Sequence, residues 1–172
     1  MPTGFFHRPA CRLHDMGPGH PEAPRRLSLI EDALAARGVM DLLRHYEAPL
    51  ATRVQLERVH RPEYLDSLAA LAPVEGLVNL DPDTAMNAEA MGFCFFNNVA
   101  VGAAQALAVH GLDRVAVLDF DVHHGNGTEA IFHSDPRVMV CSAYQHPLYP
   151  FSGAPSIPGR IINVELPAET RG

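Results

Sequence analysis

Three short apolar runs in the second half of the chain do not alternate with polar residues, and this pattern limits the possible folds more than any other feature. The runs occupy residues 114–120, 137–144 and 161–166, and helical patterns at 97–111 and 125–135 precede the first two. Strands that are apolar on both faces are typical of parallel sheets covered by helices. The sequence therefore predicts a three-layer α/β fold with a mostly parallel sheet and helices on both faces, in which ligands bind beyond the carboxyl ends of the strands.

The first half of the chain reads as a loop followed by helices. The stretch 14–26 (HDMGPGHPEAPRR) is too rich in Gly and Pro for regular structure, and helical spacing of apolar residues follows over 25–38. Residues 52–73 have helical periodicity on both sides of Pro62, which predicts two short helices that meet there. Residues 80–87 (LDPDTAMN) read as the start of a loop and a helix.

Composition bounds the class of protein. The 172 residues are 47% hydrophobic and 19% charged, which suits one globular domain over 1–172. A formal charge of −7 without a Lys/Arg cluster argues against nucleic acid as a partner. The sequence has no signal peptide, no apolar run near the roughly 18 residues of a membrane span, and 3 scattered cysteines. We therefore expect a soluble cytoplasmic protein that binds no membrane.

The first predicted strand ends in a row of polar residues, Asp119, Asp121 and His123, within the stretch VLDFDVHHGNG. Side chains alternate across a strand, so these three would project to one side. Grouped carboxylates at the edge of a core need compensation, and Asp oxygen with His nitrogen suits zinc or a related divalent ion. A strand-end Asp can instead cap the next helix, and for an isolated D-x-H pattern we favour that reading. The second histidine and two glycines favour a site, because glycine lets the backbone turn sharply and approach closely.

Four segments, in order, resemble the zinc-dependent histone deacetylase family, whose bacterial members include acetylpolyamine amidohydrolases and other acyl-lysine-type deacylases. They are GHPEAPRRL, GFCFFNNVAVGAA, LDFDVHHGNG and SAYQHPLYPFSG, and they span Gly19 to Gly153. The D-x-D-x-H-H-G-x-G stretch is far more specific than a single short motif. The resemblance implies an arginase-like α/β fold. His14 and His20 lie in the loop that borders the tunnel in this family, but surface histidines are usually solvated, so we assign them no role.

The resemblance also implies bound ions. A zinc ion would be held by Asp121 and His123, with Asp119 behind them orienting the site. Oxygen atoms around these three residues and Ser142 would hold a structural monovalent cation such as K⁺.

By the same resemblance, a narrow tunnel would admit the substrate. Phe93 resembles one aromatic wall of that tunnel, Gly92 would accept the substrate's amide N–H, and Tyr149 or Phe151 would form the opposite wall. Asp81 resembles the rim aspartate that holds the substrate backbone. From the residue types alone, a Phe beside a Gly is more often part of a core, and an Asp before Pro is ordinary turn chemistry.

The sequence departs from the family pattern in two places. The histidine pair that serves as general base and acid lies just upstream of G-F-C in the family, and here MNAEAMGFC lacks it. The third metal ligand, an aspartate, and the carbonyl-polarising tyrosine come from downstream segments in the family. We therefore expect that a segment is missing between Asn87 and Ala88 and that more chain follows residue 172, and that the 172-residue chain alone is inactive.

The favoured function is metal-dependent removal of an acyl group, such as acetyl, from an acylated amine such as acetyl-lysine or acetylpolyamine. One alternative is a non-catalytic module that binds an acyl-amine or a metal. A second is an arginase-type ureohydrolase, which needs a further carboxylate at the position that Gly125 occupies. The acyl group, the amine and the oligomeric state are left open, and an oligomer is compatible with the sequence.

Overall fold

The computed structural model describes most of the chain. The described residues are 3–15, 17–20, 23–73, 76–81, 84–87, 95–153 and 155–170. They divide into two compact units, one formed by Met1–Arg53 with His60–Phe96 and the other by Val54–Val59 with Asn97–Gly172. In the described part of the chain, no helix is long and apolar enough to cross a membrane.

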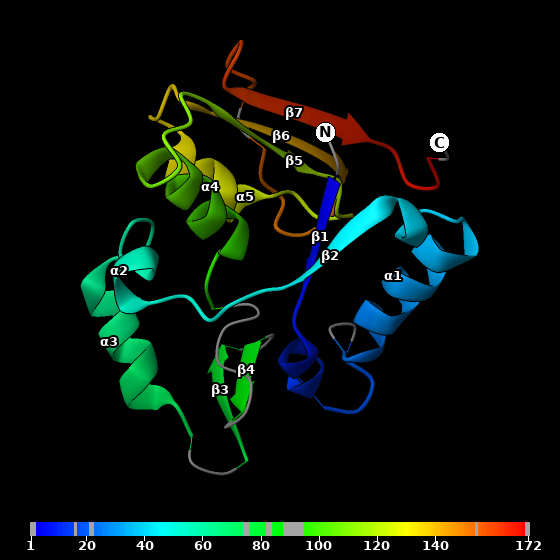
Figure 1. The fold of residues 1–172 in the computed structure, drawn as a ribbon, viewed down its shortest axis with the longest axis vertical. Helices are drawn as coiled ribbons and strands as arrows, with labels where there is room; N and C mark the ends of the chain where they lie inside the picture. Colours follow the sequence, from blue (N-terminus) through cyan, green and yellow to red (C-terminus); the bar gives the residue numbers. More distant parts are fainter. Residues whose placement is uncertain are drawn as a thin grey trace. The chain divides into compact units, whose positions relative to one another are not determined.

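The second unit is built on a three-stranded parallel sheet (Figure 1). Its strands, in spatial order, are β5 (Val115–Asp119), β6 (Val138–Gln145) and β7 (Ile161–Leu166). The helices α4 (Asn98–Ala108) and α5 (Asn126–Phe132) lie together on one face of this sheet (Figure 1). All five elements stand where the apolar runs and helical patterns predicted them.

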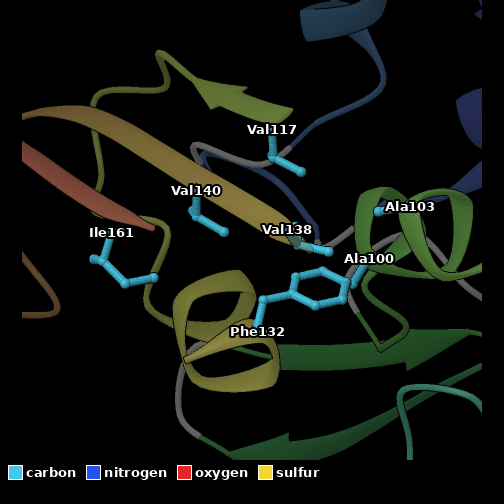
Figure 2. Close-up of a cluster of buried hydrophobic side chains, with 7 residues drawn as sticks. All are labelled: Ala100, Ala103, Val117, Phe132, Val138, Val140 and Ile161. Atoms are coloured by element: carbon cyan, nitrogen blue, oxygen red, sulfur yellow. The ribbon is translucent and has the colours of Figure 1, made fainter. Parts of the chain in front are cut away.

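The parallel register stacks this sheet in layers. Val117, Val140 and Ile161 are direct neighbours across the three strands, and all three are buried. Figure 2 shows these side chains together with Val138, next to Phe132 of α5 and two alanines of α4. Ala100 and Ala103 are small, so α4 can approach the sheet closely. The ring of Phe132 fills the remaining space between the two helices and β6. The core of this unit is therefore a single apolar layer.

The first unit contains strands that the sequence analysis did not predict. They are β1 (Thr3–His7), β2 (Leu43–Glu47), β3 (Leu77–Asp81) and β4 (Thr84–Asn87). β1 and β2 pair in parallel, and β3 and β4 pair antiparallel. The remaining elements are two short 3₁₀ helices (Pro9–Leu13 and Met40–Leu42), α1 (Arg25–Ala36), α2 (Arg53–Leu56), which bridges the two units in sequence, and α3 (Pro62–Leu71).

The helices of this half were predicted correctly. α1 ends one residue before the pair Arg37–Gly38, and Gly38 adopts φ +67°, a left-handed conformation that favours glycine. α2 and α3 lie on either side of the bend before Pro62, as the break in the pattern at that proline indicated.

The interpretation of residues 80–87 as the start of a loop and a helix was wrong. Thr84–Asn87 is a strand that pairs with Leu77–Asp81, and Met86 is buried with Leu68 and Phe95. The expectation of a solvated His14 was also wrong, because this side chain is only 3% exposed, and burial lowers its pKa. Tertiary packing decided both cases, and local composition carries no signal of it.

We expect Phe132→Ala to destabilise the protein by about 3–5 kcal/mol, because the ring is 4% exposed and its removal leaves a cavity that the sheet cannot close. Val109→Ala is the matched control at the end of α4. Val109 is 56% exposed, so its truncation should change the free energy of unfolding by no more than about 0.5 kcal/mol. Urea unfolding of both variants measures the difference. Equal effects would contradict the assignment of this core.

Candidate metal centre

The three parallel strands change from apolar to polar at the same level. One step beyond the layer of Val117, Val140 and Ile161, the neighbouring residues across the sheet are Asp119, Ser142 and Asn163. Asp119 is the last residue of β5, at the end of the strand where ligands of open α/β sheets bind, whereas Ser142 and Asn163 lie inside β6 and β7. The sheet therefore carries a polar row directly above its core.

The turn after β5 folds on its own aspartates. The Asp121 N–H donates to Asp119 Oδ1 (3.1 Å), and the His123 N–H donates to Asp121 Oδ1 (3.0 Å). The carbonyl of Val122 accepts from the N–H of Gln145 in β6 (3.0 Å). The sequence pattern predicted that the three polar residues lie on one face of a continuing strand, but β5 ends at Asp119. Side-chain-to-backbone bonds of the Asx type supply the geometry instead.

This turn brings the two predicted metal ligands together. Asp121 Oδ1 and His123 Nδ1 are 3.2 Å apart, and both side chains are about half exposed. Two atoms that each lie about 2.0–2.2 Å from one tetrahedral zinc ion are separated by little more than this. The donor set of one carboxylate oxygen and one imidazole nitrogen therefore fits a zinc ion. Among the residues that the structure describes, no group of three or more His, Cys, Asp or Glu side chains could hold a metal.

Asp119 and Ser142 lie behind this pair. Ser142 is buried, and its Oγ accepts from the Gly125 N–H at 3.1 Å. A Cβ added to Gly125 would come closer than 3.0 Å to Asp119 Oδ2 and would lie 3.5 Å from Ser142 Oγ. The space that a side chain at residue 125 would need is thus bordered by two oxygen atoms. Both atoms belong to residues that the resemblance assigns to a monovalent cation such as K⁺, and that assignment stays a prediction.

The predicted tunnel residues fall in different parts of the structure. The ring of Tyr149 meets the ring of His123 edge to face, with centroids 6.4 Å apart, and it is exposed. Phe151 is also exposed and has φ +57°, which is rare for an aromatic residue. Asp81 is the last residue of β3. Gly92 and Phe93 lie outside the described residues, so their predicted roles stay predictions.

A largely buried polar network beside the predicted metal ligands was not itself predicted. His124 Nε2 lies 2.9 Å from Glu129 Oε2, and His124 Nδ1 lies 2.9 Å from Ser152 Oγ. Asn163 Nδ2 donates to the same Glu129 oxygen at 2.8 Å. The ring of Tyr144 packs on His124 with centroids 4.6 Å apart, and burial raises the pKa of Tyr144.

One signal in the sequence could have found part of this network. Asn163 interrupts the apolar run IINVEL two residues after Ile161, as Asp119 does two residues after Val117. A polar residue that recurs at one level of neighbouring strands marks a site at the sheet edge. Glu129 gives no comparable signal, since an acidic residue in a helix is ordinary.

Comparison with known proteins places this site in a family. The profile described as "Histone deacetylase domain" matches residues 84–172, which is more than half of the chain and includes the turn with Asp121 and His123. The chain belongs to the histone deacetylase family.

Individual members of the family agree over most of this chain. It is 36% identical over 196 residues to the protein slr0245 of Synechocystis sp., with 88% of this chain and 64% of that protein covered. It is 32% identical over 228 residues to the histone deacetylase-like amidohydrolase of Pseudomonas aeruginosa, with 96% and 60% covered.

A solved structure confirms the fold class. The crystal structure of the HDA15 HD domain matches with a TM-score of 0.76 and 27% identity, covering 95% of this chain and 62% of that one. The α/β fold predicted from the apolar runs is therefore correct. The chain spans about three fifths of the length of each of these three proteins.

The close approach at Gly125 gives a stability test. We expect Gly125→Ala to destabilise the protein by about 1–3 kcal/mol, because the new Cβ collides with the Asp119 carboxylate and forces it to move. Gly127→Ala is the matched control inside α5. There the nearest atom to a new Cβ is 3.8 Å away, so we expect stabilisation by about 0.4–1 kcal/mol. Urea unfolding measures both, and a similar effect for the two variants would refute the close approach.

Proposed function

We propose that the protein removes an acyl group, such as acetyl, from an acylated amine by metal-dependent hydrolysis. The observation that carries this proposal is the pair Asp121 Oδ1 and His123 Nδ1, 3.2 Å apart at the carboxyl end of a parallel strand in a histone deacetylase family member. Acetyl-lysine and acetylpolyamine are the substrate classes we favour. The relative in Pseudomonas aeruginosa is named as an amidohydrolase, which supports cleavage of an amide bond.

The proposed reaction is the hydrolysis of an amide bond. The amide C–N bond breaks, the hydroxyl of water joins the acyl carbon, and the remaining proton goes to the amine, so that acetate and a free amine leave. Asp121 and His123 would hold the zinc ion, which supplies Lewis-acid chemistry toward the acyl carbonyl and water. Asp119 would orient the pair, since its carboxylate accepts the Asp121 N–H. K⁺ would be held by oxygen atoms around Asp119 and Ser142.

The substrate path is proposed from the family resemblance. Tyr149 would form one wall, and its contact with the His123 ring supports a place next to the reacting group. Phe151 is the alternative for that wall, and Phe93 would stand opposite. Gly92 would accept the substrate amide N–H, and Asp81 would hold the substrate backbone at the rim.

The general base is proposed to lie in a segment that this chain lacks. The alignment with the Pseudomonas aeruginosa amidohydrolase is 228 residues long, which exceeds the 172 residues of the chain. The relative therefore carries residues inside the matched region that have no counterpart here. We assign them to the junction of Asn87 and Ala88, because the resemblance expects the histidine pair just before G-F-C.

An arginase-type ureohydrolase is disfavoured by the close packing at Gly125. Such a site needs a carboxylate at this position to bridge two metals, and a Cβ there would collide with Asp119 Oδ2. A module that binds an acyl-amine or a metal without catalysis is the second candidate for the 172-residue chain. The absence of a third ligand among the described residues favours it for this chain alone.

In the protein made from the complete coding region, Asp121→Ala should abolish zinc binding and deacylation together, because one of the ligands is lost. Acetyl-lysine peptides and acetylpolyamines are the substrates, and zinc content is measured alongside turnover. Asp113→Ala is the control, since this aspartate is exposed in the loop before β5. Full activity of the protein after removal of zinc would refute the mechanism.

The 172-residue chain by itself should give no turnover in the same assay. Its described residues offer two ligands at the site, whereas a catalytic zinc ion ordinarily has three protein ligands and a water. Zinc-dependent turnover by this chain would contradict the proposal that the remaining machinery lies elsewhere.

Sequencing of the coding region across codons 87 and 88 tests the missing segment. We expect an intervening stretch that contains two adjacent histidines, and the natural protein should yield no peptide in which Asn87 is bonded directly to Ala88. Peptide mapping by mass spectrometry provides the second measurement. Recovery of a continuous Asn87–Ala88 peptide from the natural protein would show that the chain lacks this base.

A further inference from the structure

We propose that His124, Glu129 and Asn163 form a buried clamp that positions the turn carrying Asp121 and His123. The role of the clamp in metal binding rests on the proposed function, while its role in ordering the turn does not. These residues come from the turn itself, from α5 and from β7. None of them is a ligand of the proposed ion, and they act as positioning residues.

Two members of the clamp, His124 and Glu129, are enclosed by protein, and Asn163 is partly buried. The His124 side chain is 2% exposed and the Glu129 side chain 11%. A carboxylate oxygen only accepts hydrogen bonds, so His124 Nε2 and Asn163 Nδ2 both donate to Glu129 Oε2, at 2.9 and 2.8 Å. A buried carboxylate is costly unless it is paired in this way. Each member therefore depends on the other two.

Both ring nitrogens of His124 have a partner. Nε2 donates to Glu129, and Nδ1 lies 2.9 Å from Ser152 Oγ. The Tyr144 ring packs on the imidazole, which restricts its remaining freedom. The orientation of His124 is thus fixed at both edges and on one face. A side chain held in this way also restrains the position of its own backbone, which is bonded directly to His123.

The turn needs an anchor of this kind. The hydrogen bonds that shape it, from the Asp121 N–H to Asp119 and from the His123 N–H to Asp121, are exposed to solvent. Exposed hydrogen bonds open readily because water competes for the same groups. His124 points into the protein while His123 is half exposed, so the anchor lies one residue from the ligand. The clamp would keep Asp121 Oδ1 and His123 Nδ1 at a separation that one metal ion can bridge.

The test compares variants of the 172-residue chain. Glu129→Ala and His124→Phe break the clamp, and Glu129→Gln is the conservative variant, because its amide oxygen can still accept from His124. Val138→Ala is the control for general destabilisation, since this core residue lies in β6 away from the clamp. Amide hydrogen exchange is measured at residues 121, 123 and 138. Zn²⁺ affinity is measured by calorimetry, and binding by the Asp121→Ala chain is subtracted as the background from other sites.

We expect the clamp-breaking variants to lose protection at the Asp121 and His123 amides while the Val138 amide stays protected. Their Zn²⁺ dissociation constant should rise about 10-fold, in the range seen when supporting residues of metal sites are removed. Glu129→Gln should restore both measurements toward wild type. Val138→Ala should lower the melting temperature without a selective loss at the turn.

Two results would overturn the clamp. One is unchanged exchange at Asp121 and His123 in Glu129→Ala. The other is a loss of amide protection at Asp121 and His123 in Val138→Ala that equals the loss in Glu129→Ala. Such a result would mean that the loss follows from lower global stability and not from the clamp. If the wild-type and Asp121→Ala chains bind Zn²⁺ equally, the metal site of the proposed function fails, and the amide exchange then decides the clamp by itself.

Discussion

The parallel register that sets Val117, Val140 and Ile161 side by side is the constraint on which the site depends. Side chains alternate along a strand, so a slip of one residue would turn the whole apolar set away from the helices. Burial against α4 and α5 therefore holds the register. The same register then fixes Asp119, Ser142 and Asn163 as neighbours one step further along. The apolar layer thus determines which polar groups become neighbours across the sheet at the end of β5.

From this row, the site is completed by short-range contacts. Asp119 shapes the turn through one oxygen and lies against Gly125 with the other, while Ser142 accepts from the Gly125 N–H. Only glycine allows this approach, since any Cβ would occupy the position of the carboxylate. The second glycine of the motif, Gly127, has no such close neighbour. The close approach therefore accounts for Gly125 but not for Gly127.

The second half of the fold could be predicted from the sequence because its strands are continuous apolar runs, and helices with clear ends precede the first two of them. β1 and β2 could not, because β2 (LRHYE) contains neither an apolar run nor a regular apolar–polar alternation, and only 5 residues pair. Their stability comes from cross-strand contacts such as Phe6 on Tyr46, whose ring centroids lie 5.1 Å apart. Contacts of this kind are visible only once the pairing is known.

In the candidate site too, residues close together in the sequence could be predicted, whereas partners far apart in the sequence could not. Asp121 and His123 lie two residues apart, so a local pattern was sufficient to predict that they would meet, although a turn and not a strand brings them together. Glu129 and Asn163 are separated by 34 positions. Only the packing of α5 against the sheet makes them partners, and sequence spacing contains no record of it.

The two adjacent histidines show why this site needs buried support. Neighbouring side chains on an irregular turn leave the backbone in different directions, so His123 can face solvent while His124 is held inside. A metal ligand must be accessible to the ion, and accessibility exposes the hydrogen bonds that position it. A turn that supplied only accessible residues would lose its geometry whenever water replaced those bonds. Placing the anchor on the next residue separates the two requirements, because His124 can be fully paired in the interior without occupying any of the space around His123.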